Sequence, residues 1–186
     1  MRWQRLFADL EAQFDAAERR ELDVEVADRT RHELAQVGLQ DRLRAAAGER
    51  IEARVCGVGA IRGVLQATGA GWVLLGAPGP VEWLVPTTSL LTVAGLGRAA
   101  SPAVAARSVE GRLGLRHMLR AIARDRAAVH LTLTDGWTWS GTLERVGADH
   151  FDVAGSPDDV ARPGGPAGVV TVTFSGFAAL RRASAR

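Results

Sequence analysis

The sequence predicts an α+β fold in which an N-terminal helical hairpin is followed by two five-stranded antiparallel small barrels, each preceded by a helix. Three observations support this expectation. Apolar residues recur every three or four positions between residues 1 and 38, the period changes to two after Gly48, and the strand pattern that starts at Ile51 returns at Val129. At 186 residues, of which 47% are hydrophobic, the chain is long enough to bury cores of this size.

Residues 1–38 are predicted to form the helical hairpin. Trp3, Phe7, Leu10 and Phe14 follow the spacing of one helical face, with charged residues at most positions between them. A second amphipathic segment runs from about residue 24 to residue 37, before Gly38. The apolar face of the first helix is a candidate interaction surface, because it must pack either on the rest of the chain or on a partner.

Residues 39–94 are predicted to form the first barrel with its leading helix. A short helix ends at Gly48, and Ile51, Ala53 and Val55 then alternate with more polar residues, as in a half-buried strand. Further short strands are expected as far as residue 94. Residues 95–111 are rich in Gly, Ala, Ser and Pro, which is typical of a linker.

Residues 112–182 are predicted to form the second barrel, followed by a tail at 183–186. Leu115, Met118, Leu119 and Ile122 share one face of its leading helix, and strands resume at Val129. When Ile51 is set on Val129, the turns and inward apolar positions of the two strand sets coincide without a gap as far as Gly76, and Gly63 falls on Gly141. The sequence therefore indicates two tandem repeats of one unit.

A signature in the second repeat supplies a family resemblance. Its residues are Val129, Leu131, Leu133, Asp135-Gly136, Gly141, Leu143, Asp149, Phe151 and Val153. This pattern resembles the first signature of the Sm-like (LSm, Hfq-like) proteins, whose small barrels are SH3-like. The pair Asp135-Gly136 suits a two-residue type I′ turn, and Gly141 would permit the sharp bend of a barrel strand.

The resemblance implies a protein that binds single-stranded RNA, as an RNA chaperone or regulator. It makes Asp149 a candidate RNA-binding residue, because Asp149 matches the aspartate of the family's RNA-binding loop. The asparagine of that loop is replaced by Val153 in one repeat and Leu75 in the other, and the arginine of the second signature is missing before Gly176. The resemblance therefore supports the fold more strongly than it supports the family's usual uridine pocket.

Arginine is the sole basic residue apart from histidine. All 23 basic residues are Arg, the net charge is only +2, and the lack of Lys, Asn and Tyr indicates a bacterium with a high-GC genome. Residues 98–126 nevertheless hold seven Arg against two acidic residues. The candidate nucleic-acid-binding residues in this segment are Arg112, Arg116, Arg120, Arg124 and Arg126. The first four lie four residues apart in a helical stripe, and Arg126 lies near its end. This stripe is either a phosphate-binding strip or the solvated face of a protein without lysine.

Trp137 and Trp139 lie at alternate positions in a predicted strand, so both rings are expected on one face. Two interpretations fit this spacing. The rings form a platform on which bases stack, or they belong to a barrel core or a contact between barrels. As a base-stacking platform or as a contact between barrels, the pair is a candidate interaction surface.

The sequence predicts neither catalysis nor a cofactor. It contains no nucleophile elbow, no phosphate-binding loop, no dinucleotide fingerprint and no His or Cys spacing suited to a metal. The single cysteine, Cys56, excludes an internal disulfide and is typical of a reducing compartment. Without an apolar run long enough for a membrane span, we expect a cytoplasmic, non-membrane protein.

Two functional hypotheses follow. In the first, the arginine stripe and the barrel loops hold single-stranded RNA, and binding is sensitive to salt. In the second, the protein is a non-enzymatic interaction or assembly module, in which the N-terminal helices and the edge strands mediate self-association or contact with a protein partner.

Overall fold

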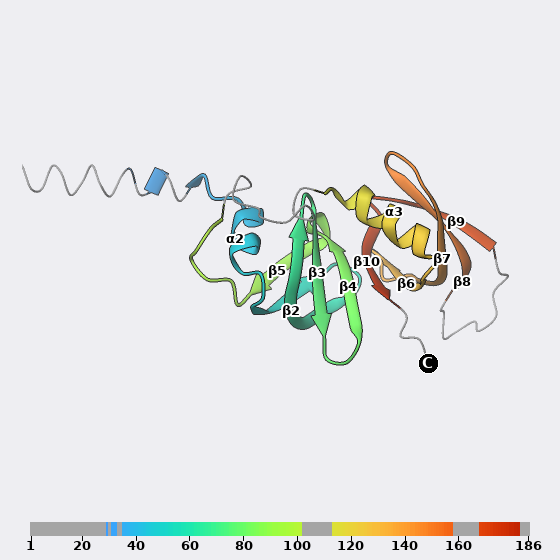
Figure 1. Ribbon diagram of the computed structural model, residues 1–186, viewed down its shortest axis with the longest axis horizontal. Helices are drawn as coiled ribbons and strands as arrows, with labels where there is room; N and C mark the ends of the chain where they lie inside the picture. Colours follow the sequence, from blue (N-terminus) through green and yellow to red (C-terminus); the bar gives the residue numbers. More distant parts are fainter. Residues whose placement is uncertain (1–28, 30, 33–34, 102–112, 158–167, 183–186) are drawn as a thin grey trace, which may run out of the picture. The chain divides into compact units, whose positions relative to one another are not determined.

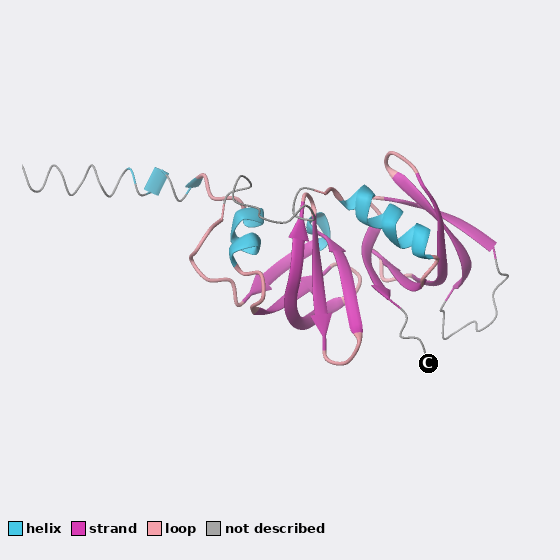
Figure 2. Ribbon diagram, viewed as in Figure 1, coloured by secondary structure: helices cyan, strands magenta, loops and turns pink. Residues whose placement is uncertain are grey.

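The computed structural model describes residues 29, 31–32, 35–101, 113–157 and 168–182. The chain divides into two compact units, Met1–Gly38 and Leu39–Arg186. The predicted interaction residues of the first unit, Trp3, Phe7, Leu10 and Phe14, lie outside the described residues, and so does Arg112. The elements that carry the fold belong to the second unit (Figures 1 and 2).

The second unit contains two similar series of elements, here called the first half (residues 39–94) and the second half (residues 115–182). The first half consists of α2 (Leu39–Ala45), β1 (Arg50–Val55), β2 (Gly59–Gly69), β3 (Trp72–Ala77), β4 (Val81–Pro86), the 3₁₀ turn η1 (Thr87–Ser89) and β5 (Leu90–Ala94). The second half consists of α3 (Leu115–Asp125), β6 (Ala128–Leu133), β7 (Thr138–Val146), β8 (His150–Pro157), β9 (Gly168–Thr173) and β10 (Phe177–Arg182).

The predicted fold class is wrong. The structure is not a helical hairpin followed by two separate five-stranded barrels, because all ten described strands belong to one antiparallel sheet, in the order β5-β1-β2-β3-β4-β10-β6-β7-β8-β9. Within the described residues, α2 and α3 are the α-helices that accompany this sheet.

The pairing of β4 with β10 is what joins the two halves into one sheet. Leu84 lies opposite Leu180, and Trp83 lies opposite Arg181, whose guanidinium carbon is 5.6 Å from the centre of the indole ring. Each strand edge carries backbone N–H and C=O groups that need partners, and the two edges supply them to each other. Leu84 and Leu180 are almost completely buried at this junction.

The two halves have the same strand register. In β1 and β2, Ile51 lies opposite Gly63, and in β6 and β7 the equivalent residues, Val129 and Gly141, lie opposite each other. The irregularity in β2 between Leu65 and Ala67 recurs in β7 between residues 143 and 145. Each half is therefore built on the same backbone plan, bulge included.

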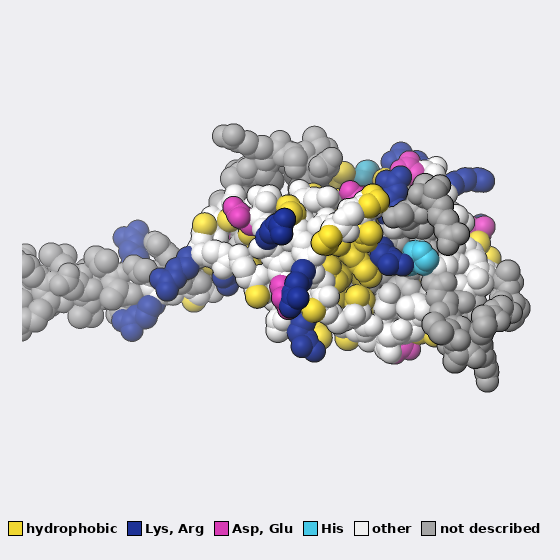
Figure 3. All heavy atoms as spheres, turned by 90° about the horizontal axis from the view of Figure 1, so that it is seen from below, with side chains coloured by type: hydrophobic (Ala, Val, Ile, Leu, Met, Phe, Trp, Pro, Cys, Tyr) yellow, Lys and Arg dark blue, Asp and Glu magenta, His cyan; other side chains and the backbone are white. Residues whose placement is uncertain are grey.

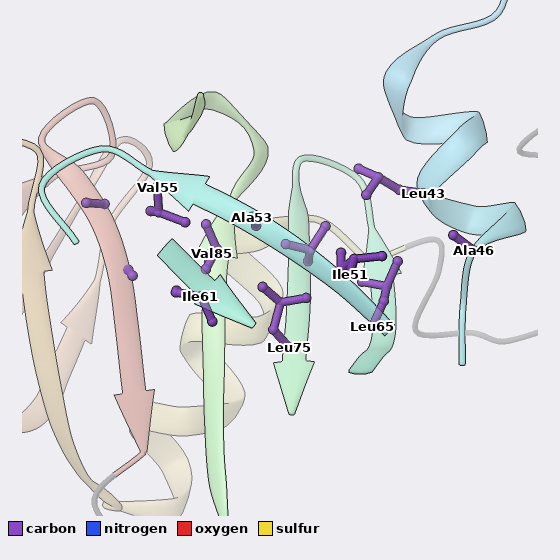
Figure 4. Packing of buried hydrophobic residues seen from close by; sticks show 12 residues of the cluster. Leu43, Ala46, Ile51, Ala53, Val55, Ile61, Leu65, Leu75 and Val85 are labelled. Carbon is purple, nitrogen blue, oxygen red and sulfur yellow. The ribbon is translucent and has the colours of Figure 1, made fainter. Parts of the chain in front are cut away.

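Two hydrophobic cores are buried in the sheet, and each takes most of its residues from one half and a few from the other. The first core gathers Leu43 of α2 and the inward residues of β1, β2, β3 and β4, as Figure 4 shows, together with two alanines of β10. The second core contains Leu119 of α3 together with Phe151 and Phe177, whose rings meet edge to face at 5.3 Å, and it also includes buried residues of β3 and β4. Alternation of apolar residues along the strands places these side chains on one face.

The Asp135-Gly136 turn differs from the expected two-residue type I′ turn. Leu133 N donates a hydrogen bond of 2.8 Å to Trp137 O, so three residues form the loop. A type I′ turn needs positive φ at both central residues, but only Gly136 has it, at 90°. Asp135 instead accepts a hydrogen bond of 2.9 Å from Trp137 N through its carboxylate.

Candidate nucleic-acid interface

Helix α3 presents one apolar and one basic face. Leu119 is fully buried, and Leu115, Met118 and Ile122 pack against the second core, as their spacing predicts. The helix ends at Asp125, and its C-cap residue Arg126 adopts the left-handed conformation with φ 50°. Docking of the apolar face therefore fixes which residues point to solvent.

The basic face of α3 carries three of the predicted arginines. Arg116, Arg120 and Arg124 recur at every fourth position and are exposed, and Arg126 is exposed just beyond the helix. One such step advances about 6 Å along a helix. Guanidinium groups at this spacing can follow successive phosphates of an extended strand, since each offers several N–H donors in a fixed plane.

A groove of about 470 Å³ lies between this face and strand β7. Its lining residues are His117, Arg120, Ala123, Arg124, Glu144, Arg145 and Val146. Arg120 Nη2 donates a long hydrogen bond of 3.5 Å to Val146 O, which links the helix to the strand at the groove. Three guanidinium groups face one carboxylate here, so the groove carries a positive excess.

Arg145 is a basic-groove residue that sequence reasoning missed. Strict alternation would place Arg145 on the same inward face as the buried Leu143. The bulge between these two residues shifts the register, so that Arg145 lies opposite Asp152 and its side chain is exposed. The sequence signal for this exposure was a charged residue, Arg145, at a position where strict alternation predicts an inward side chain.

Asp149 lies apart from the basic groove, in the turn between β7 and β8. Its carboxylate is 2.8 Å from His150 Nδ1, and this hydrogen bond holds the pKa of Asp149 below its ordinary value. Asp149 is not among the residues that line the groove. Its backbone carbonyl accepts a hydrogen bond of 2.8 Å from Phe174 N, so the residue also fixes the adjoining turn.

The two tryptophans of the predicted aromatic surface differ in burial. Trp139 is 7% exposed and belongs to the second core, whereas Trp137 is 36% exposed. Their ring centres are 5.2 Å apart and the planes are tilted by 39°. Trp139 therefore contributes packing, and only Trp137 offers an open ring edge or face.

In the described part of the first half, the positions that correspond to the groove arginines are either engaged with the chain itself or occupied by another residue type. When Leu43 is set on Leu119, Arg44 takes the position of Arg120, but Arg44 binds the Asp41 carboxylate and donates a hydrogen bond of 2.9 Å to Ser101 O. The neighbouring Arg42 likewise donates a hydrogen bond of 3.0 Å to the carbonyl of residue 97. The arginines of α2 thus hold residues 96–101 of their own chain. In the strand, an alanine at position 67 stands where the second half has Arg145.

A second hollow, of about 200 Å³, lies at the junction of the halves and is mostly apolar. Its lining residues include Leu74, Leu84, Met118, Ile122 and Leu180. Figure 3 shows hydrophobic side chains gathered on one face of the molecule. Within the described ranges, no group of three or more His, Cys, Asp or Glu side chains is arranged to bind a metal ion.

A scan against protein-family models gives no match to the chain, and a comparison with curated protein sequences gives none either. None of the helices in the described part of the chain has the length and apolar character that crossing a membrane requires. Inferences about function therefore come from the side chains of the basic groove.

Proposed function

We propose that this protein binds single-stranded RNA through the basic groove between α3 and β7, as a cytoplasmic RNA-chaperone or regulatory protein without an enzymatic step or cofactor. The observation that carries the proposal is the convergence of Arg120, Arg124 and Arg145 on one groove that contains a single carboxylate. Two of these arginines come from a helix and one from a strand, so the charge is concentrated by the fold.

The local chemistry supports phosphate as the recognised group. Guanidinium groups bind phosphate oxygens through paired N–H donors, and exposed arginines release counterions from the nucleic acid when they do so. Arg116 extends the stripe on the same helix face beyond the groove. The basic side chains of the stripe are all arginines, which are suited to phosphate contacts. We therefore expect affinity for RNA with little preference for base sequence.

The signature that resembles Sm-like proteins supports RNA as the nucleic acid. Its residues Val129, Leu131, Leu133 and Gly141 lie in β6 and β7, and β7 also supplies an arginine of the groove. The proposal does not use the family's uridine pocket, whose asparagine is replaced here by the buried Val153. It relies on the backbone contacts that the arginines can make.

The test measures affinity for a labelled single-stranded RNA of mixed sequence by fluorescence anisotropy, over a range of salt concentrations. The variant combines Arg120→Ala, Arg124→Ala and Arg145→Ala. The control combines Arg50→Ala, Arg54→Ala and Arg98→Ala, which removes the same charge from exposed positions outside the groove.

We expect the groove variant to bind much more weakly and to flatten the plot of log K against log salt by about 2, because each phosphate contact contributes about 0.7 to the slope for single strands. The control should bind like the original protein. Equal losses in the two variants would show that binding follows net charge alone, and an unchanged groove variant would falsify the proposal.

A further inference from the structure

The apolar hollow of about 200 Å³ at the junction of the halves, here called the junction hollow, has a floor of leucines from three neighbouring strands. Leu74 of β3 lies opposite Leu84 of β4, and Leu84 lies opposite Leu180 of β10. Residues that face each other across paired strands project from the same side of a sheet. The three side chains therefore form one apolar row.

Helix α3 supplies the wall of the junction hollow. Met118 and Ile122, one helical turn apart, line it together with the small side chain of Ala121. Leu74, Met118 and Ile122 pack against the second core but are only partly buried. Because open apolar surface in a concave site is stabilised when an apolar group covers it, the hollow favours an apolar ligand.

Three charged residues also line the junction hollow: Glu82, Asp125 and Arg182. Asp125 at the end of α3 and Arg182 at the end of β10 are both exposed. The register that sets Trp83 opposite Arg181 places Glu82 opposite Arg182, one residue further along. Within the described ranges, none of these three side chains forms an ion pair. Their charges are therefore available to a ligand.

The volume of the junction hollow limits the size of the apolar group that it accepts. An apolar cavity of about 150 Å³ holds one benzene molecule, whereas pockets for drug-sized ligands start at about 300 Å³. The hollow, at about 200 Å³, lies between these two sizes. It therefore suits one aromatic ring or one branched alkyl chain, which is the size of a large amino-acid side chain.

The signs of the three charges restrict the ligand further. Two carboxylates favour a cationic group, and the guanidinium favours a carboxylate. Directly opposite residues of paired strands have Cβ atoms about 5 Å apart, so one carbon atom that bears both an ammonium and a carboxylate can reach Glu82 and Arg182 together. The charged residues therefore suit a zwitterion attached to an apolar group.

We propose that the junction hollow binds a free α-amino acid with an aromatic or large branched side chain. The side chain enters the hollow, the ammonium group donates hydrogen bonds to Glu82 and Asp125, and Arg182 donates hydrogen bonds to the carboxylate. The same residue within a peptide lacks at least one of the two charges, so the ligand is the free molecule. This inference goes beyond RNA binding, since none of the residues that line the hollow lines the basic groove.

The first test is isothermal titration calorimetry of the full chain with L-phenylalanine and L-leucine as probes. Each of three analogues lacks one feature: phenethylamine lacks the carboxylate, phenylpropionate lacks the ammonium, and glycine lacks the apolar side chain. We expect one probe molecule to bind per chain and each analogue to bind about tenfold more weakly, through loss of a charge-assisted hydrogen bond or of apolar contact. No binding of either probe, or equal binding of any analogue, would overturn the proposal.

The second test locates the ligand without any substitution. Ile122 and Met118 line the junction hollow, whereas Ile51 and Ile61 belong to the first core. We expect L-phenylalanine to shift the NMR signals of the Ile122 and Met118 methyl groups and to leave those of Ile51 and Ile61 unchanged, because the current of an aromatic ring acts at short range. Unchanged signals for Ile122 and Met118 would contradict the proposed site.

The third test removes single charges while keeping the side chains similar in size. Arg182→Gln and Glu82→Gln should each weaken the binding of L-phenylalanine about tenfold. Arg98→Gln and Glu49→Gln change exposed residues that do not line the hollow, so these matched controls should bind like the original protein. Unaltered binding by both hollow variants, or equal losses in variants and controls, would overturn the assignment.

Discussion

The two halves of the sheet share a backbone plan but differ in the surface that their helices present. The register of β1 with β2 and that of β6 with β7 agree residue for residue when Ile51 is set on Val129. By contrast, α2 directs Arg42 and Arg44 to carbonyl groups of its own chain, whereas the arginines of α3 line an open groove. The pairing of the strands is thus repeated in both halves, whereas the arginines of the two helices have different surroundings.

Glycines at equivalent positions show how closely the two scaffolds correspond. A Cβ atom on Gly63 would lie 2.3 Å from Gly76 O, and one on Gly141 would lie 1.9 Å from Ala154 O. Both contacts are to the backbone of the neighbouring strand, which cannot move aside as a side chain can. The bend at these glycines therefore brings two backbones too close for any side chain.

The largest expected effect comes from filling this close approach. Gly141→Ala and Gly63→Ala should each lower the free energy of unfolding by about 4 kcal/mol, since paired strands must separate to admit the methyl group. Gly97→Ala is the control, because the added atom meets nothing closer than 3.9 Å. Urea denaturation followed by circular dichroism measures the change in the free energy of unfolding. If only one of the two variants were destabilised, the two halves would not be structurally equivalent at this position.

The next effect concerns the leucines that dock the two helices. Leu43 and Leu119 are both fully buried and occupy equivalent positions in α2 and α3. Leu43→Ala and Leu119→Ala should each cost about 3 kcal/mol of stability through lost burial and a remaining cavity. Thermal unfolding of the two variants compares them directly. Near-neutral behaviour of either variant would mean that its helix is not held by this side chain.

A smaller effect separates the two helices by function. Arg120→Ala should weaken binding of single-stranded RNA about fivefold at about 0.1 M salt, which is the contribution of one released counterion. Arg44→Ala, the equivalent change in α2, should leave RNA affinity unchanged while destabilising the fold by about 1 kcal/mol, because its bonds to Asp41 and Ser101 are lost. Parallel anisotropy titrations and urea denaturation test this division; an equal loss of RNA affinity in both would contradict it.

The smallest effect depends on pH and on a cross-strand pair that differs between the halves. Glu52 lies opposite Arg62 and accepts a hydrogen bond of 2.6 Å from its Nε, whereas the equivalent pair in the second half is His130 and Ser140. The hydrogen bond and the charge of Arg62 lower the pKa of Glu52. The pair therefore stabilises the fold above the ordinary pKa of a glutamate, and this contribution is lost as pH falls through the lowered value.

Titration of the Glu52 carboxyl carbon by NMR measures this shift. Arg62→Ala should raise the pKa of Glu52 toward its ordinary value and remove its share of the acid dependence of stability. Because both side chains reach solvent, the effect on stability should be slight. A pKa for Glu52 that does not respond to Arg62→Ala would show that another group lowers it.

Local patterns in the sequence predict individual elements well. The alternation of Ile51, Ala53 and Val55 indicates β1, where all three are buried, and the spacing of Leu115 and Leu119 indicates the inward face of α3. These patterns depend on residues that are neighbours along one strand or helix. They suffice to orient an element but do not determine which edges meet.

Long-range pairing and local irregularities escaped the prediction for physical reasons. The junction of β4 with β10 brings Leu84 to Leu180, far along the chain, and no period in either strand specifies its partner. Arg145 escaped because a bulge reverses the side on which it projects. The turn at Asp135 differs from the expected type I′ turn because Asp135 does not adopt a positive φ, and its carboxylate instead accepts a hydrogen bond within the turn.

The most direct measurement of the central claim is the location of bound RNA on the chain. RNA that contains a photoreactive uridine is cross-linked to the intact protein, and the attached peptides are identified by mass spectrometry. We predict cross-links in α3 and in residues 144–146 of β7, with few in α2 or β2. Cross-links concentrated in the first half, or spread evenly over both halves, would contradict the assignment of the basic groove as the RNA-binding site.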